Sequence, residues 1–134
     1  MADLSQTAAN VGVNDSNTRT QIVQAGEAIT QGEPVYLNNG KYFLGDASAL
    51  ASSQVTGIAL TPAVTDGYFI MATSGKVDLG DTLTVGETYY VSDTPGNIMP
   101  AGDISTGEYV TSLGVASAAD TLELNINASG IARA

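Results

Sequence analysis

Three residue types are missing from this sequence, and their absence removes much of the chemistry that enzymes use. The 134 residues include no cysteine, no histidine and no tryptophan. Without cysteine there are no disulfides or thiolate metal sites, and without histidine neither Ser–His nor Cys–His catalysis is possible. The lack of tryptophan removes a ring that commonly stacks on sugars. We therefore expect a non-enzymatic protein with no catalytic residue, cofactor or metal site.

Basic residues and long apolar runs are also scarce. Four basic residues stand against fourteen acidic ones, which gives a net charge of −10. Nucleic-acid binding needs clustered Lys and Arg, and an anionic membrane would repel such a surface. No apolar run reaches the roughly 18 residues that span a bilayer, and the first residues lack the features of a signal peptide. We expect a soluble protein made in the cytoplasm, with neither nucleic acid nor membrane as a partner.

Carboxylates are the one catalytic group in good supply. Glycoside hydrolysis needs only two of them. Most acidic residues lie beside glycines, as in Gly26-Glu27 and Asp66-Gly67, a placement typical of solvated turns. Asp78-Leu79-Gly80-Asp81 is the best calcium candidate, but it lacks the Asp-x-Asp-x-Asp-Gly ligand spacing. A glycosidase and a calcium site therefore stay minor alternatives.

One pattern occurs twice in the chain. The segment Gly26–Glu33 returns as Gly80–Glu87, and Gly57-Ile58-Ala59 returns as Gly114-Val115-Ala116. A single copy would leave an open apolar sheet face, so the two copies are expected to share one core. We predict an all-β domain over residues 21–134, a small β-barrel or β-sandwich of the β-clip or β-tulip type. Its two tandem repeats cover about 21–78 and 79–134.

Strand and turn signals fill this domain. The expected strands are 21–24, 34–38, 41–44, 55–60, 68–73, 76–79, 88–92, 97–99, 109–115 and 121–127, with Ser74-Gly75 as a turn between two of them. In the last strand, Leu122, Leu124 and Ile126 should face the core, because side chains alternate along a strand. Residues 47–53 are expected to form a turn or two of helix in a surface insertion.

Glycine-containing turns should reverse the chain within each repeat. Asn-Gly favours a type I′ hairpin, and Pro-Gly favours a type II turn, because both need a residue that tolerates positive φ. We consider the repeated glycines structural for the same reason. The predicted structural turn residues are Gly26, Gly32, Asn39, Gly40, Gly80, Gly86, Pro95 and Gly96.

The first twenty residues differ from the rest in composition. They are rich in Ser, Thr, Asn and Ala, with Leu4, Val11 and Val13 as scattered aliphatic residues. So little apolar surface is typical of a segment that does not order by itself. We predict a flexible N-terminal arm over residues 1–20, whose Leu4, Val11 and Val13 are candidate partner-binding residues. An ordinary frayed terminus is the alternative.

Beyond the arm, the chain resembles the small capsid decoration (cement or head-stabilising) proteins of tailed double-stranded-DNA phages. The resemblance lies in phrases such as Val23–Ile29, Ala72–Val77, Leu83–Ser92 and Tyr109–Ala116. It implies a β-rich plug, commonly a homotrimer, on the outer surface of the virion head. There it would bind the major capsid protein and stabilise its lattice, and the N-terminal segment would order against that lattice. Similar modules occur on phage tail fibres.

A second class of function stays open from the residues. Tyr89, Tyr90 and Tyr109 could form an aromatic patch that faces a sugar, although strand alternation places some of them in the core. The alternative prediction is a receptor- or carbohydrate-binding β module of a phage tail fibre or a surface protein.

Overall fold

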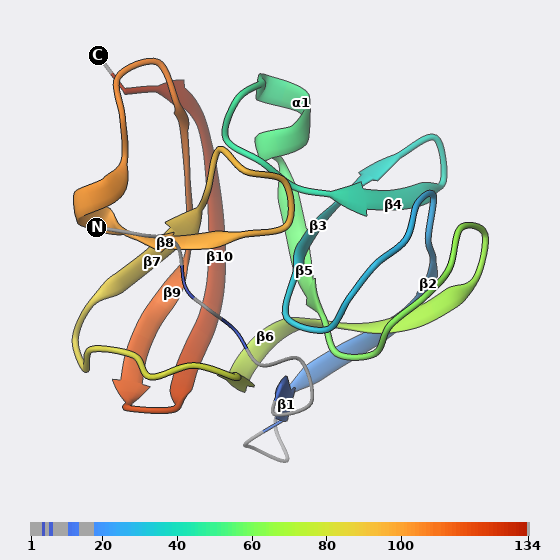
Figure 1. Cartoon of the computed structure of the whole chain (residues 1–134), viewed down its shortest axis with the longest axis horizontal. Coiled ribbons are helices and arrows are strands. Elements are labelled where there is room, and N and C mark those ends of the chain that lie inside the picture. The colour runs from blue at the N-terminus through green and yellow to red at the C-terminus, as the bar shows by residue number, and fades with distance from the viewer. Residues whose placement is uncertain (1–3, 5, 7–10, 14–17, 134) are drawn as a thin grey trace.

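The computed structural model describes Leu4, Gln6, residues 11–13 and residues 18–133, and this part of the chain is dominated by antiparallel β-strands (Figure 1). The predicted all-β class is confirmed. The strands form one curled half-barrel sheet. They are β1 (Val11–Val13), β2 (Arg19–Gln24), β3 (Pro34–Asn38), β4 (Lys41–Leu44), β5 (Val55–Ala59), β6 (Tyr68–Leu79), β7 (Thr88–Val91), β8 (Ile98–Pro100), β9 (Tyr109–Ala118) and β10 (Thr121–Ala132), with two short helices, α1 (Leu50–Ser53) and η2 (Ala101–Asp103).

The order of strands follows the sequence repeat. It runs β4-β3-β5-β6-β10-β9-β7-β8, with β1 and β2 paired to β6. When β3, β4, β5 and β6 are matched with β7, β8, β9 and β10, the order reads the same from both ends. Figure 1 shows the hairpin β3–β4 on one side of the molecule and the hairpin β7–β8 on the other. Two tandem copies predict such an order, while superposition of the two halves stays a prediction.

The turn that opens each repeat makes matching hydrogen bonds. The backbone N–H of Gly32 donates to Ala59 O at 2.7 Å, and that of Gly86 donates to Ala116 O at 2.8 Å. Both glycines have positive φ, +88° and +87°, where a side chain would be strained. The repeated glycine at this position therefore reverses the chain onto β5 in one half and onto β9 in the other.

Both predicted hairpins are confirmed. Asn39 (φ 54°) and Gly40 (φ 83°) connect β3 to β4, as a type I′ turn requires. Between β7 and β8, the N–H of Asn97 donates to Thr94 O at 3.1 Å across Pro95-Gly96. Gly96 has a φ of 81°, which fits the third position of a type II turn.

The predicted turn at Ser74-Gly75 is wrong, because β6 runs through it without a break. Gly75 has a φ of +99°, and near this point β6 changes partners on both of its edges. On one edge β2 pairs with residues 68–74 and β1 with residues 77–79, and on the other edge β5 pairs with residues 71–72 and β10 with residues 74–78. The glycine therefore lies in a continuous strand where one set of partners is followed by the next. The last strand is also longer than predicted and ends at Ala132.

The segment at residues 47–53 contains a helical turn as predicted, and residues 48–51 are exposed, but the two ends of the segment are buried. Ala47 and Ser53 are fully buried. The N–H of Tyr109 donates to Ala47 O at 2.9 Å, and the Thr111 hydroxyl donates to Ser53 O at 2.6 Å. These hydrogen bonds connect the first half of the chain to β9, so the segment is part of the interface between the two halves.

The core forms two contiguous clusters. The larger one joins both halves and includes Ile58, Leu79, Leu113 and Leu122, all fully buried. The smaller one lies in the first half around Phe69 and Met71. The predicted alternation of β10 is confirmed, since Leu122 and Leu124 are buried and Ile126 packs against the larger cluster. Glu123, Asn125 and Asn127 are exposed.

Parts of the predicted arm lie against this body. Leu4 packs on the larger cluster, and its N–H donates to Ile98 O at 2.9 Å. The Gln6 side-chain amide donates to the carbonyls of Gly32 and Leu79, and Val11 is buried. Residues 1–3, 5, 7–10 and 14–17 of the predicted flexible arm lie outside the described residues. The arm as a whole stays a prediction.

Candidate binding surfaces

The described residues contain no cluster of three or more Asp or Glu side chains that could hold a metal ion. Glu33 is the carboxylate with the most distinctive environment. Its burial raises its pKa above the usual 4.5, the N–H of Thr30 lowers it, and the charge of Glu27 raises it further. The Thr30 N–H donates to Glu33 Oε1, so this carboxylate stabilises the turn at residues 30–33.

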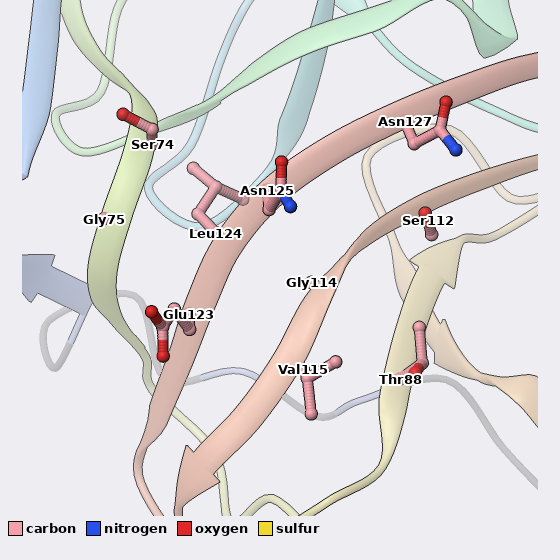
Figure 2. A pocket seen from close by; sticks show the side chains of 10 residues that line it. All are labelled: Ser74, Gly75, Thr88, Ser112, Gly114, Val115, Glu123, Leu124, Asn125 and Asn127. Atoms are coloured by element: carbon pink, nitrogen blue, oxygen red, sulfur yellow. The ribbon is translucent and has the colours of Figure 1, made fainter.

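A groove of about 610 Å³ crosses the outer face of the sheet (Figure 2). Four strands supply its walls and floor: β6, β7, β9 and β10. The residues that line it are Ser74, Gly75, Thr88, Ser112, Gly114, Val115, Glu123, Leu124, Asn125 and Asn127. Figure 2 shows Asn125 and Asn127 in sequence along β10, with Ser112 beside them on β9.

The groove is rich in uncharged hydrogen-bonding groups. Five neutral polar side chains line it, and within the described part of the chain none of them makes a hydrogen bond to another residue: Ser74, Thr88, Ser112, Asn125 and Asn127. Glu123 is the single carboxylate in the lining, and it lies opposite Lys76 across the β6–β10 ladder. Such a lining suits a neutral ligand with several hydroxyl or amide groups.

Close contact between strands forms the floor of this groove. A Cβ on Gly114 would lie 2.1 Å from Glu123 O on β10, so only glycine fits there. The equivalent Gly57 is similar, since its Cβ would lie 2.8 Å from Ala72 O on β6. The absence of a side chain at these two glycines allows β9 to lie close to β10 and β5 to lie close to β6.

A second surface is apolar and lies over β2 and β6. Ile22 and Ile70 are directly opposite each other in the antiparallel ladder, so their side chains share one face. That face is the outer one, because Ile22 is 71% exposed and Tyr68, two residues before Ile70, is 69% exposed. We call Ile22, Tyr68 and Ile70 the apolar patch.

The patch was missed in the sequence, although a signal was present. Tyr68-Phe69-Ile70-Met71 is apolar at four consecutive positions, whereas a strand with one solvent-exposed face usually alternates apolar and polar residues. Phe69 and Met71 face the core and are buried. The outward pair, Tyr68 and Ile70, is therefore the part of this run that burial in the core does not explain.

Most predicted turn residues have the expected backbone, with one difference. Gly32, Gly40, Gly80, Gly86 and Gly96 have positive φ, and Asn39 shares it. Gly26 is not among the glycines with positive φ, and a Cβ there would lie 2.3 Å from the ring of Phe43. Gly26 therefore packs closely against the Phe43 ring, whereas its repeat partner Gly80 has a positive φ that favours glycine.

The structure places several of the predicted partner-binding and sugar-facing residues. Leu4 and Val11 contact the core of their own chain in this arrangement, and partner binding by the arm stays a prediction. Tyr89 is buried, and its hydroxyl accepts a hydrogen bond from the N–H of Thr84 at 3.0 Å. Tyr90 and Tyr109 are half-buried. The three tyrosines therefore do not make one exposed patch.

Among the described residues, no helix is long and apolar enough to cross a membrane. A comparison of the chain with protein-family models and with curated proteins finds no match.

Proposed function

We propose that this chain is a structural capsid decoration protein, which binds the outer surface of a phage head and stabilises the lattice of the major capsid protein. The observation that carries the proposal is the apolar patch, a group of exposed apolar side chains on an otherwise acidic body without histidine or cysteine. In this role the protein works by binding alone and needs no catalytic group.

The patch has the chemistry of a docking site. Exposed apolar surface is costly in water, and a contiguous group of large apolar side chains commonly marks a protein-binding surface. Tyr68 and the two isoleucines lie on paired strands, so the surface is preorganised. Repetition over a lattice would make the assembly strong even where each contact is weak.

Co-sedimentation with purified expanded heads tests the proposal. The wild-type protein should sediment with heads, and Tyr68→Ser should reduce the bound fraction several-fold because it removes the largest side chain of the patch. Val85→Ser is the matched control, since Val85 is exposed on a turn outside the patch. Equal binding by wild type and Tyr68→Ser would remove the patch from the interface, and recovery with tails alone would contradict the proposal.

The groove of Figure 2 favours a second candidate, a carbohydrate-binding module of a tail fibre or surface protein. Asn125 and Asn127 offer amides that can both donate to and accept from neighbouring hydroxyls. A glycan array would show binding that is lost in the double variant Asn125→Ala/Asn127→Ala. Absence of any glycan signal from the wild type would eliminate this candidate.

A further inference from the structure

Among the described residues, β2 and the end of β10 each have a strand edge without a backbone partner. β2 pairs with β6 along one edge, and its opposite edge is open at Arg19–Ile22. Residues 126–132 of β10 pair with β9 along one edge, and their opposite edge receives no backbone hydrogen bond. The outer edge of β4 is covered, since Gly26 N–H donates to Tyr42 O. We call these two segments the β2 edge and the β10 edge.

The two edges have different surroundings. β2 and β10 lie on opposite edges of β6, since Ser74 pairs with both Arg19 and Asn125. Beyond Asn125 the edge of β10 that faces β6 is unpaired, and there Ile126 and Ala128 line a cavity of about 430 Å³ with residues 54–56 of the same chain. Two different edges can form a heterologous joint, which links one copy to the next.

The composition of the edges favours contact with another edge. Neither residues 19–24 nor residues 124–133 contain an acidic residue, although the chain has fourteen. Each edge presents one exposed isoleucine, Ile22 on β2 and Ile131, 69% exposed, on β10. The single charge of each edge is at its margin, since Arg19 opens β2 and Arg133 follows β10. Natural edge strands usually carry charges or proline within the strand to prevent pairing, and these two do not.

We propose that copies of this chain join head to tail, with the β10 edge of one copy paired to the β2 edge of the next. The backbone groups of both edges gain partners, and Ile22 and Ile131 lie within the joint. Each edge carries an arginine and no carboxylate, so the edges form no ion pair with each other. Backbone hydrogen bonds and apolar contacts hold the joint. Added salt screens the repulsion between two bodies of charge −10 and strengthens the association.

Light scattering on three variants tests the joint. The wild type should have a mass that is a multiple of 13.6 kDa and that increases in population with salt. Ile22→Lys and Ile131→Lys should each abolish assembly, because lysine on an edge strand opposes pairing. Val64→Lys is the matched control: Val64 is 75% exposed and lies on neither edge, so this variant should assemble as the wild type does.

Mixing the two edge variants gives the decisive result. The Ile22→Lys chain keeps an intact β10 edge, and the Ile131→Lys chain keeps an intact β2 edge. The mixture should therefore form complexes of two chains, although neither variant assembles alone. Hydrogen exchange should slow at residues 19–22 and 126–132 as the wild-type concentration rises.

Three results would overturn the head-to-tail joint. One is a wild type that stays at 13.6 kDa up to its highest soluble concentration. Another is a mixture in which both variants remain single chains. The third is loss of assembly in only one variant, which would mean that one edge pairs with itself. Head binding is measured separately with Tyr68→Ser, which changes the apolar patch and neither edge, so none of these results decides the proposed function.

Discussion

Gly57 and Gly114 make the same close approach to a neighbouring strand in the two halves of the chain. Gly57 lies opposite Val35 and Gly114 lies opposite Tyr89, and the next pair along each ladder is displaced by a bulge. A β-carbon at either position would collide with a backbone carbonyl, of Ala72 or of Glu123. The repeated glycine therefore fixes the spacing between strands in both halves.

Replacement of Gly114 by alanine should be strongly destabilising. Its added Cβ would lie 2.1 Å from Glu123 O, and backbone atoms of β9 and β10 would have to separate. We expect a loss of about 3 kcal/mol in the free energy of unfolding, measured by chemical denaturation. Gly107→Ala is the control, since no atom lies within 4 Å of its Cβ and only a positive φ of +89° opposes it. Equal losses for the two variants would contradict the close approach.

Gly86→Val separates backbone strain from crowding. The φ of Gly86 is +87°, and a Cβ there would meet nothing within 4 Å. The variant should lose about 1–3 kcal/mol through backbone strain alone. An unchanged melting temperature would refute the structural role assigned to this glycine.

Gln6→Ala should loosen the N-terminal segment without unfolding the body. The variant loses hydrogen bonds of 3.0 Å to Gly32 O and 2.9 Å to Leu79 O. The cost should be about 1–2 kcal/mol, since each intramolecular hydrogen bond contributes about 1 kcal/mol. Amide exchange should quicken at Leu4, whose N–H donates to Ile98 O. Unchanged exchange there would show that Gln6 does not hold the segment.

Glu33→Gln should stabilise the protein at neutral pH and have little effect in acid. Burial raises the pKa of Glu33 above its usual 4.5, so the folded state holds this proton more tightly than the unfolded state. Its favourable contribution is present below pH 4.5 and is lost as pH rises through the folded-state pKa. Glutamine keeps an oxygen that can accept from Thr30 N–H and carries no charge. Melting temperatures of variant and wild type are compared at neutral pH and in acid. The same difference in melting temperature under both conditions would contradict this assignment.

Local signals in the sequence predicted local structure well. The hairpin at Asn39-Gly40 is encoded by two adjacent residues that tolerate positive φ, so no distant contact is needed to infer it. Alternation along β10 likewise predicts which side chains are buried. These features depend on residues that are neighbours in the chain.

Features that depend on distant contacts were not predicted. Ser74-Gly75 has the composition of a turn, and only the pairing of β6 with β2 and β5 before it and with β1 and β10 after it explains why the strand continues. The small residues at 47–53 look like surface sequence, and residues 48–51 are exposed, but Tyr109 and Thr111 of β9 hold the two ends of the segment by hydrogen bonds. The groove and the apolar patch combine residues from separate strands, so strand order had to be known first.

Binding to phage heads is the most direct test of the proposed function. Purified expanded heads that lack the protein should take it up to a saturating number of copies and then resist heating or osmotic shock better than bare heads. Tyr68→Ser should need a higher concentration to give the same protection. A protein that stays in the supernatant with intact heads, and leaves their stability unchanged, would contradict the role of capsid decoration.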